Sequence, residues 1–221
     1  IDLVQIKAEP IGALIDGVRA ALPWLGNFSK NQAEHSTHFV FKFAPESAPE
    51  SQLKLKVEIN TREHKNLHGI RMYPFDVNSD WYQSSSQVAS FEPEELFGTK
   101  LRALLQRRKN RDLFDLNQGL IQLALDTDRL IACFEHYLSL QGQSITRAMA
   151  EKRMLQKLEK SLTEDIAPLL PVGTTFTDED AIVAFRRIWF ELIQSLTGEP
   201  WKFSERIIEE LRGSRIPKLL L

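Results

Sequence analysis

Basic side chains gather in one short stretch of the sequence, residues 100–115. This stretch carries six basic and two acidic residues, a local charge of about +4, whereas the whole chain has a formal net charge of −2. A concentrated positive charge suits a ligand that bears phosphate groups. The alternative is a solvated basic face on an ordinary pair of helices, and charge alone leaves both interpretations open.

Two helices must position these charges. Four leucines between positions 96 and 105 recur at helical spacing after Pro93, a residue suited to the first turn of a helix. Lys100 falls on this helix. The periodicity stops before Arg107, Asn110 offers a cap or turn, and a second helical run starts near Asp112. The sequence therefore predicts a helix, a basic turn and a second helix.

The same stretch resembles the signature of the AbiEii-type nucleotidyltransferases, toxin components of bacterial toxin–antitoxin systems. That signature has an acidic lead, a lysine, a leucine and alanine face and basic residues, and it closes on an Arg-Asp pair, an aromatic residue, an aspartate and a leucine. The commonest family form has Tyr in place of Phe114 and often Pro in place of Asn110, and neither difference removes a charged group. The residues that match the signature, in order, are Glu94, Glu95, Lys100, Leu101, Ala103, Leu104, Arg107, Arg111, Asp112, Phe114, Asp115 and Leu116.

The resemblance implies transfer of a nucleotide from a nucleoside triphosphate to an RNA acceptor such as a tRNA end, with a cognate antitoxin protein as partner. Lys100 would contact the triphosphate. Asp112 would orient that lysine or an arginine, or contact the nucleotide, and Asp115 would do the same or only cap the second helix. The residues expected to hold phosphates of the nucleotide or of the RNA are Arg107, Arg108, Lys109 and Arg111.

The chain opens with Ile1, Asp2, Leu3 and Val4, which resembles the second half of an Asp-Ile-Asp-Leu motif of the same family. Two carboxylates one residue apart on a strand point to one face and can hold Mg²⁺ against nucleotide phosphates. The resemblance therefore implies that Asp2 is a magnesium ligand. It also implies a first aspartate and a glycine turn upstream of Ile1, so we expect this chain to be truncated at its N-terminus and inactive alone. The alternative is that Asp2 is a frayed terminal residue without a role.

Residues 53–60 show the clearest alternation of apolar and polar side chains in the chain. The four apolar residues would face a core, and Glu58 would lie on the polar face. In the resembling enzymes a strand of this kind supplies an acidic residue that acts as general base toward the acceptor hydroxyl or as a metal ligand. Glu58 is our candidate for that catalytic residue. The alternative is a solvated glutamate paired with Lys56 or Arg62.

Other segments before residue 93 complete an α+β region. Periodicity predicts a helix over residues 10–22 and a strand over 38–43 that forms an antiparallel hairpin with residues 53–60. One more strand is predicted over 69–73, and the serine-rich segment 76–90 is predicted to be a loop.

After residue 116 the apolar spacing predicts helices only, over 120–137, 145–162, 179–196 and 203–211. Thr177 opens the third of them as a cap, and the basic residues between 147 and 160 are predicted to form a solvated face. We therefore expect an α+β fold, with a small mixed or antiparallel sheet and helices of the nucleotidyltransferase type, followed by a C-terminal helical bundle. Residues 1–116 would form the nucleotidyltransferase-like domain and residues 117–221 the helical domain.

Composition excludes several classes of protein. The 221 residues are 43% hydrophobic and 26% charged, which is ordinary for a globular protein, and the single cysteine excludes an internal disulfide. No apolar run reaches the length of a membrane span, so we expect a soluble, cytoplasmic protein with no membrane partner. Two alternatives to an enzyme stay open: a non-catalytic module that binds nucleic acid or regulates, and a helical interaction protein whose basic turn meets an acidic partner.

Overall fold

The computed structural model describes residues 1–213, which fold as two compact units. The first unit spans Ile1–Asn66 and the second begins at Leu67. Both contain strands and helices, and the helices predominate after the strands, so the predicted α+β fold class is confirmed.

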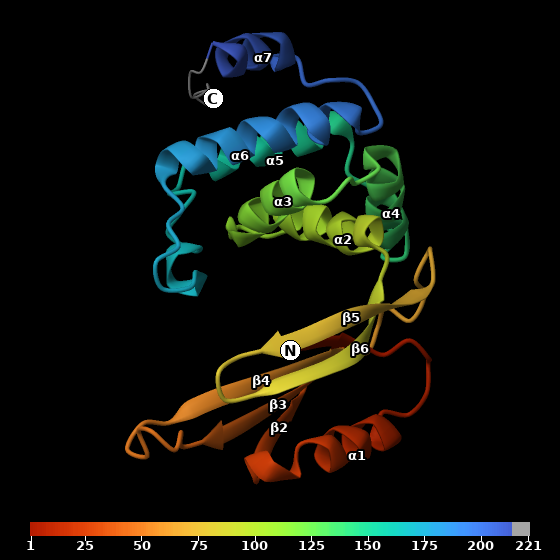
Figure 1. Ribbon diagram of the computed structural model, residues 1–221. Coiled ribbons are helices and arrows are strands. Elements are labelled where there is room, and N and C mark those ends of the chain that lie inside the picture. Colours follow the sequence, from red (N-terminus) through yellow and green to blue (C-terminus); the bar gives the residue numbers. More distant parts are fainter. Residues whose placement is uncertain (214–221) are drawn as a thin grey trace. The chain divides into compact units, whose positions relative to one another are not determined.

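The first unit is a four-stranded mixed sheet with one helix on one face (Figure 1). Strand order is β1-β4-β3-β2, in which β1 pairs parallel with β4 and the other two pairings are antiparallel. The predicted antiparallel hairpin of residues 38–43 with 53–60 is therefore confirmed as β3 and β4. The elements are β1 Asp2–Val4, α1 Gly12–Ala21, the short 3-10 helix η1 Pro23–Leu25, β2 Phe28–Gln32, β3 Ser36–Phe43 and β4 Leu53–Asn60.

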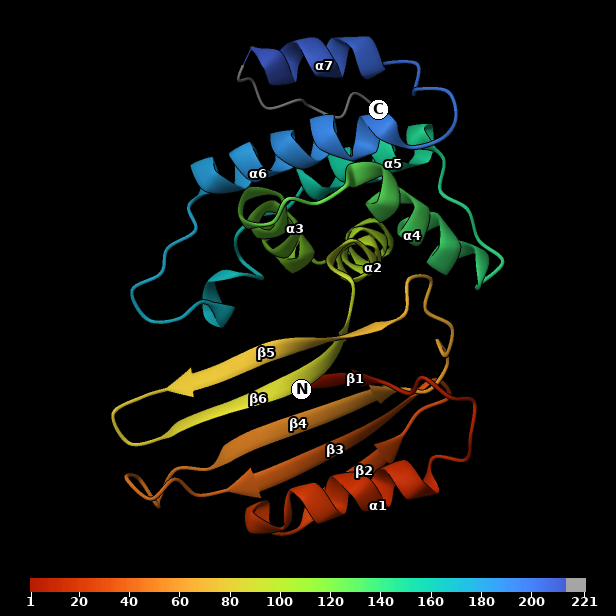
Figure 2. The ribbon, with the colours of Figure 1, turned by 45° about the vertical axis from the view of Figure 1, so that its right-hand side comes forward.

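Alternating side chains of β3 and β4 build the core of this unit. Phe39, Phe41, Val57 and Ile59 are buried on one face, because residues two apart on a strand point the same way. Apolar side chains of α1, including Leu14, pack against them. Figure 2 shows α1 lying along that face of the sheet. The opposite face of β4 carries its polar residues, as its alternation predicts.

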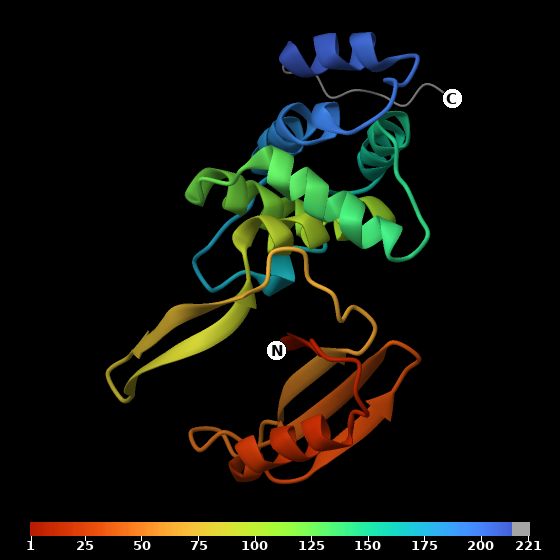
Figure 3. The ribbon, with the colours of Figure 1, turned by 90° about the vertical axis from the view of Figure 1, so that its right-hand side faces the viewer.

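The second unit begins with an antiparallel hairpin, β5 Ile70–Asn78 and β6 Gln83–Phe91. The prediction of a loop over 76–90 is wrong, because the strands stay in register from the pair Ile70 and Phe91 to the pair Asn78 and Gln83. The Ser79 hydroxyl donates to the Tyr82 carbonyl in the turn between them. Both faces of β6 are largely exposed, so its serines need not alternate with apolar residues, and the usual strand pattern is missing. Figure 3 shows the hairpin projecting from the start of α2.

Helices form the rest of this unit. The predicted single helix over 120–137 is wrong: α3 ends at Gln122 and α4 begins at Thr127, after Asp126 accepts hydrogen bonds from the amides of Asp128 and Arg129. The predicted cap at Thr177 is confirmed as a capping box with Asp180. The helices are α2 Pro93–Gln106, α3 Arg111–Gln122, α4 Thr127–Ser139, α5 Arg147–Lys157, η2 Ala167–Leu169, α6 Asp178–Glu191, η3 Ile193–Ser195 and α7 Ser204–Arg212.

Packing unites α2 and α3 with the later helices rather than with the four-stranded sheet. Leu101, Leu104, Leu113 and Leu116 are fully buried in one core with residues of α4, α5, α6 and α7. The compact units therefore divide at residues 66 and 67, whereas the sequence placed a boundary after 116. The assignment of residues 1–116 and 117–221 to separate functional domains stays a prediction.

Two glutamates in the first turn of α2 fasten neighbouring segments. Glu95 is fully buried and accepts hydrogen bonds from the amides of Leu67 (2.6 Å) and His68 (3.0 Å) and from the Tyr137 hydroxyl (2.7 Å). Glu94 accepts the amide of Asp126 at 3.3 Å. These carboxylates thus fix the lead into the hairpin and the start of α4 relative to α2, because a buried carboxylate is stable only with such donors.

The close crossing of α2 and α4 yields a first prediction. A Cβ at Gly98 would lie 2.8 Å from the Cβ of Cys133 and 2.9 Å from the Leu130 carbonyl oxygen. We expect Gly98→Ala to lower the free energy of unfolding by about 2 kcal/mol, despite alanine's better helix propensity, because the helices must move apart. Chemical unfolding measures this change.

Gly17→Ala is the matched control. Gly17 also lies inside a helix, but a Cβ added there would meet no atom of residues 1–213 within 4 Å. The substitution should raise stability by about 0.5–1 kcal/mol through helix propensity alone. Equal effects of the two substitutions would contradict the close crossing.

Candidate functional site

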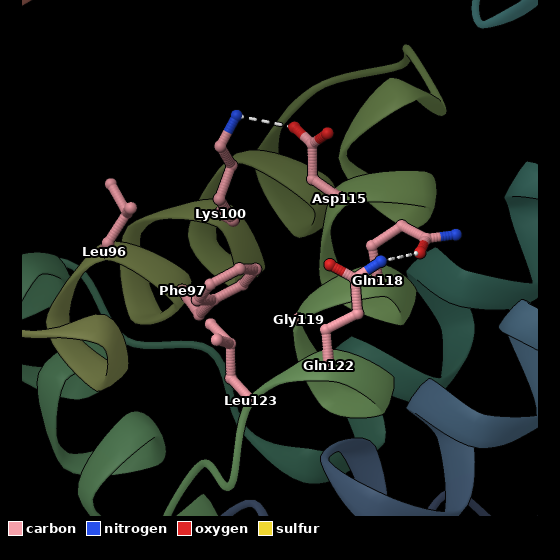
Figure 4. A pocket seen from close by; sticks show the side chains of 8 residues that line it. All are labelled: Leu96, Phe97, Lys100, Asp115, Gln118, Gly119, Gln122 and Leu123. Carbon is pink, nitrogen blue, oxygen red and sulfur yellow. Dashed lines mark hydrogen bonds and ion pairs between the residues drawn. The ribbon is translucent and has the colours of Figure 1, made fainter. Parts of the chain in front are cut away.

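Lys100 of α2 and two aspartates of α3 form a compact charged cluster. The Lys100 Nζ atom donates to Asp115 Oδ2 at 2.6 Å (Figure 4). The same Nζ atom lies 3.9 Å from Asp112 Oδ1. The side chains of Lys100 and Asp115 are 37% and 40% exposed, whereas Asp112 is almost fully buried. The sequence-predicted pair of Lys100 and Asp112 is therefore brought together, with Asp115 as the closer partner of the lysine.

Burial shapes the chemistry of Asp112. Loss of water around the carboxyl raises its pKa above the ordinary value, while the positive charges of Lys100, Arg107 and Arg111 oppose that rise. Within residues 1–213, its Oδ2 atom has no hydrogen-bond partner, although it is shielded from solvent. An oxygen of this kind can accept a hydrogen bond from a ligand or from a rearranged lysine.

The turn between α2 and α3 displays the predicted cations. Arg107, Arg108, Lys109 and Arg111 are all exposed, and they follow one another within five positions. These residues follow α2, the helix that carries Lys100, and Arg111 is the first residue of α3. The arrangement can attract phosphate groups, because exposed like charges held in one turn sum to a local positive field.

A buried lysine of α5 donates hydrogen bonds to this turn. Lys157 Nζ donates to the carbonyl oxygens of Arg107 (3.0 Å) and Lys109 (3.2 Å) and to the side-chain oxygen of Asn110 (3.4 Å). Lys157 is 6% exposed, and burial is the main reason that its pKa falls to about 8. Three acceptors match the three donors of an ammonium group. Lys157 thus fixes the backbone that carries the exposed cations.

Asn110 completes the attachment of the turn. Its backbone nitrogen donates to Asp165 Oδ2 at 3.3 Å, and its side-chain Nδ2 donates to the Ser161 carbonyl at 3.0 Å. Asn110 precedes α3 as predicted, but its side chain forms no capping bond. It binds instead to the segment after α5, which is why this position is buried.

The prediction of a solvated basic face over residues 147–160 is wrong for Lys157. Besides Lys157, Glu151 is fully buried and accepts hydrogen bonds from Arg147 Nε (3.0 Å), the Trp201 amide (2.8 Å) and the Ser204 hydroxyl (2.8 Å). A buried carboxylate with these partners joins α5 to the start of α7. Charge alternation along the sequence did not reveal that these charged groups point inward.

The two other predicted site residues lie in the first unit. Asp2 of β1 and Glu58 of β4 are directly paired across parallel strands, so their side chains leave the sheet on one face. Glu58 also receives a hydrogen bond from Lys56 Nζ at 2.5 Å and lies 3.4 Å from His38 Nε2. The Lys56 hydrogen bond is the main reason that the pKa of Glu58 falls below its usual value. The pairing with Lys56 follows the alternative interpretation of Glu58.

These two carboxylates fit a magnesium ion only as a partial site. Mg²⁺ is commonly held by one or two carboxylates together with waters and substrate phosphates. Among residues 1–213, no three His, Cys, Asp or Glu side chains gather in a group that could hold a metal ion. Asp2 and Glu58 can therefore supply the protein's share of such a site, with the nucleotide supplying the rest.

Sequence reasoning missed the residues that act from a distance in the chain. Lys157 lies 50 positions from Arg107, and its contact could not be inferred from spacing. His38 faces Glu58 as its cross-strand partner in β3. The alternation of β4 and the aromatic run of β3 predict that the two strands pair. Which residues lie opposite one another depends on the strand register, which the pattern does not give.

The comparisons with known proteins give one match. The family model described as nucleotidyl transferase AbiEii toxin, type IV TA system, matches residues 1–188 of the 221. The matched range runs from β1 into α6 and includes every site residue that the sequence predicted. Neither a curated protein nor a solved structure matches the chain.

The buried lysine yields a prediction about stability. Lys157→Met leaves three oxygens of the turn without their donor, so we expect a loss of about 2–3 kcal/mol in the free energy of unfolding at pH 7. The pKa of Lys157 is about 8 when folded and 10.5 by its reference value. Between these values the unfolded chain holds the proton that the folded chain has lost, so this group's contribution to stability rises with pH.

The stability difference between the wild type and Lys157→Met should therefore widen from pH 8 to pH 10 and stay constant below the folded pKa. Urea unfolding at each pH measures it. Lys152→Met, on an exposed position of the same helix, is the control and should change little. A difference that narrows as pH rises would contradict the lowered pKa of the buried Lys157.

Proposed function

The chain belongs to the nucleotidyl transferase AbiEii toxin family, and from this premise we propose that it transfers a nucleotide from a nucleoside triphosphate to an RNA acceptor such as tRNA. The match over residues 1–188 confirms the resemblance that residues 94–116 indicated. It places the chain among the nucleotidyltransferases of toxin–antitoxin systems. The donor, the acceptor and the individual residue roles are our proposal.

The observation that carries the proposal is the Lys100 cluster beside the basic turn. In nucleotidyl transfer an acceptor hydroxyl attacks the α-phosphorus and pyrophosphate leaves, so the protein mainly positions the reactants and neutralises charge. Lys100 is partly exposed and held by Asp115, an arrangement that lets its ammonium group exchange a carboxylate for a phosphate. Asp112, buried below it, would keep the lysine in place during that exchange.

The exposed cations of the turn supply the second part of the proposal. Arg107, Arg108, Lys109 and Arg111 would hold phosphates of the nucleotide or of the RNA. Arginine suits this purpose because its planar group binds phosphate through two parallel hydrogen bonds. The turn is pre-organised by Lys157, so the cost of ordering it on binding is small.

Asp2 and Glu58 would hold Mg²⁺ in this proposal. The metal would supply positive charge to phosphate groups. The depressed pKa of Glu58 makes it a weak base but keeps it ionised, which suits a metal ligand better than a general base. For the ion to bind, Glu58 must release Lys56 or share its oxygens with it.

A non-catalytic module that binds nucleic acid is the second candidate. It is favoured by the pairing of Glu58 with Lys56 and His38, which occupies the proposed catalytic carboxylate. In that case the basic turn would bind RNA through phosphates and no nucleotide would be transferred.

Under the first proposal the partner is an antitoxin encoded beside the toxin. No described helix is long and apolar enough to cross a membrane.

A transfer assay tests the enzyme proposal. Each of the four labelled nucleoside triphosphates is incubated with Mg²⁺, total tRNA and the protein, in the 221-residue form and in any longer form that its gene encodes. We expect label on RNA from at least one donor. Lys100→Ala and Asp112→Asn should each lower the rate by about 100-fold or more, because both remove charge that stabilises the phosphates or positions the lysine on them.

Lys152→Ala is the matched control, since Lys152 is an exposed lysine outside the cluster. Full activity in Lys100→Ala would rule out the assigned role of that residue. If no form transfers label yet the protein binds RNA with a steep salt dependence, the second candidate replaces the first. In that case Arg108→Ala should reduce the slope of log affinity against log salt by about 1.

A further inference from the structure

A cavity of about 360 Å³ opens between α2 and α3, directly beside the ion pair of Lys100 and Asp115 (Figure 4). Its lining changes character from one end to the other. The charged pair lies at one end. The two glutamines follow Asp115 along α3 on one wall, the ring of Phe97 lies across from them on α2, and Leu123 lies at the far end (Figure 4). The lining residues are Leu96, Phe97, Lys100, Asp115, Gln118, Gly119, Gln122 and Leu123.

The apolar part of the cavity is built by a close helix contact. A Cβ at Gly119 would lie 2.2 Å from Cε1 of the Phe97 ring, so only glycine at this position lets the ring lie against α3. Leu96 and Leu123 stand on either side of the ring and are 40% and 42% exposed. Exposed leucines beside a charged pair leave apolar surface in contact with water, and a flat apolar ligand would cover it.

A pair of amides forms the polar part of the α3 wall. Gln122 Nε2 donates to Gln118 Oε1 at 2.9 Å. A primary amide has two N–H donors and one carbonyl acceptor, so the hydrogen bond between the two side chains leaves the Gln122 oxygen and one Gln122 N–H for a ligand. In Figure 4 the Gln122 carbonyl oxygen lies on the side of Phe97. Glutamine amides of this kind hydrogen-bond well to the polar edges of nucleobases.

We propose that this cavity is the nucleoside subsite of the donor nucleotide, with the base beside Phe97 and its polar edge on the pair Gln118 and Gln122. This inference rests on the proposed function, and it adds which residues select the base. The lining holds a group for each part of the ligand: a cation for the phosphates, the ring of Phe97 for the face of the base, and amides for its polar edge. The size also fits, since cavities of about 300 Å³ and above hold small ligands.

The test compares a complete nucleotide with a ligand that lacks the base. Equilibrium binding of ATP, GTP, CTP and UTP, and of inorganic tripolyphosphate, is measured by calorimetry for the 221-residue chain. The variant is Gln122→Leu, which keeps the size of the side chain but removes its hydrogen bonds. Gln122 is exposed, so the substitution leaves the core intact, and thermal unfolding checks this. The matched control is Gln156→Leu, at an exposed position of α5 outside the cavity.

We expect Gln122→Leu to weaken binding of the preferred nucleoside triphosphate by about tenfold, the size typical of a lost base-edge contact. The preference among the four nucleotides should shrink, while the affinity for tripolyphosphate should stay unchanged. Gln156→Leu should alter neither. Loss confined to the nucleotides supports the subsite.

Three outcomes overturn it. If the wild type binds nucleotide and tripolyphosphate, but Gln122→Leu keeps the full nucleotide affinity and preference, the base lies elsewhere and the proposed function is untouched. If Gln122→Leu weakens tripolyphosphate as much as nucleotide, the cavity holds phosphates only. If the wild type binds neither nucleotide nor tripolyphosphate, both this inference and the nucleoside triphosphate donor of the proposed function are wrong.

Discussion

The buried ammonium group of Lys157 is the interaction on which the geometry of the candidate site depends. It reaches from α5 to two carbonyl oxygens and one side-chain oxygen of the turn that joins α2 to α3. Lys157 is 6% exposed, and burying its charge costs free energy unless each N–H donor has an acceptor. The three oxygens supply those acceptors. The same contacts stop the turn from rearranging. The angle between α2 and α3, and with it the meeting of Lys100 with Asp112, therefore depends on a residue about 50 positions away from the turn.

The other end of α2 is held by the same physical principle with the opposite charge. Glu95 is fully buried and satisfied by two backbone amides and a tyrosine hydroxyl. Between these two polar anchors the leucines of α2 are buried against α4, and Gly98 allows the two backbones to approach closely. The helix that carries Lys100 is thus fixed at both ends and along one side. Its remaining side, toward α3, is where the ion pair and the cavity beside it lie.

Charge in this region is divided between a paired lysine and four exposed cations. Lys100 is neutralised by Asp115 and lies near Asp112, so its field is local and it can change partners at small cost. The four cations of the turn are exposed and add to one another. This division suits a site that attracts a polyphosphate with one set of charges and positions it with another. In the first unit the carboxylates of Asp2 and Glu58 lie on one face of the sheet, where Glu58 pairs with Lys56 and lies near His38.

The sequence by itself determined the local elements and the family. Strong periodicity located α2 and the strand of residues 53–60, and the ordered signature from Glu94 to Leu116 identified the nucleotidyltransferase family that the match over residues 1–188 then established. Periodicity failed for the serine-rich hairpin, because its exposed faces need no alternation of apolar and polar residues. It also failed for the break at residues 123–126, where Asp126 caps a new helix within an apolar run. Only the tertiary structure decided that Glu58 pairs with Lys56 and His38, that Asp2 lies beside it, and that Lys157 and Glu151 point inward. The physical reason is that strand register and the burial of a charge depend on partners far along the chain, which spacing within one segment does not specify.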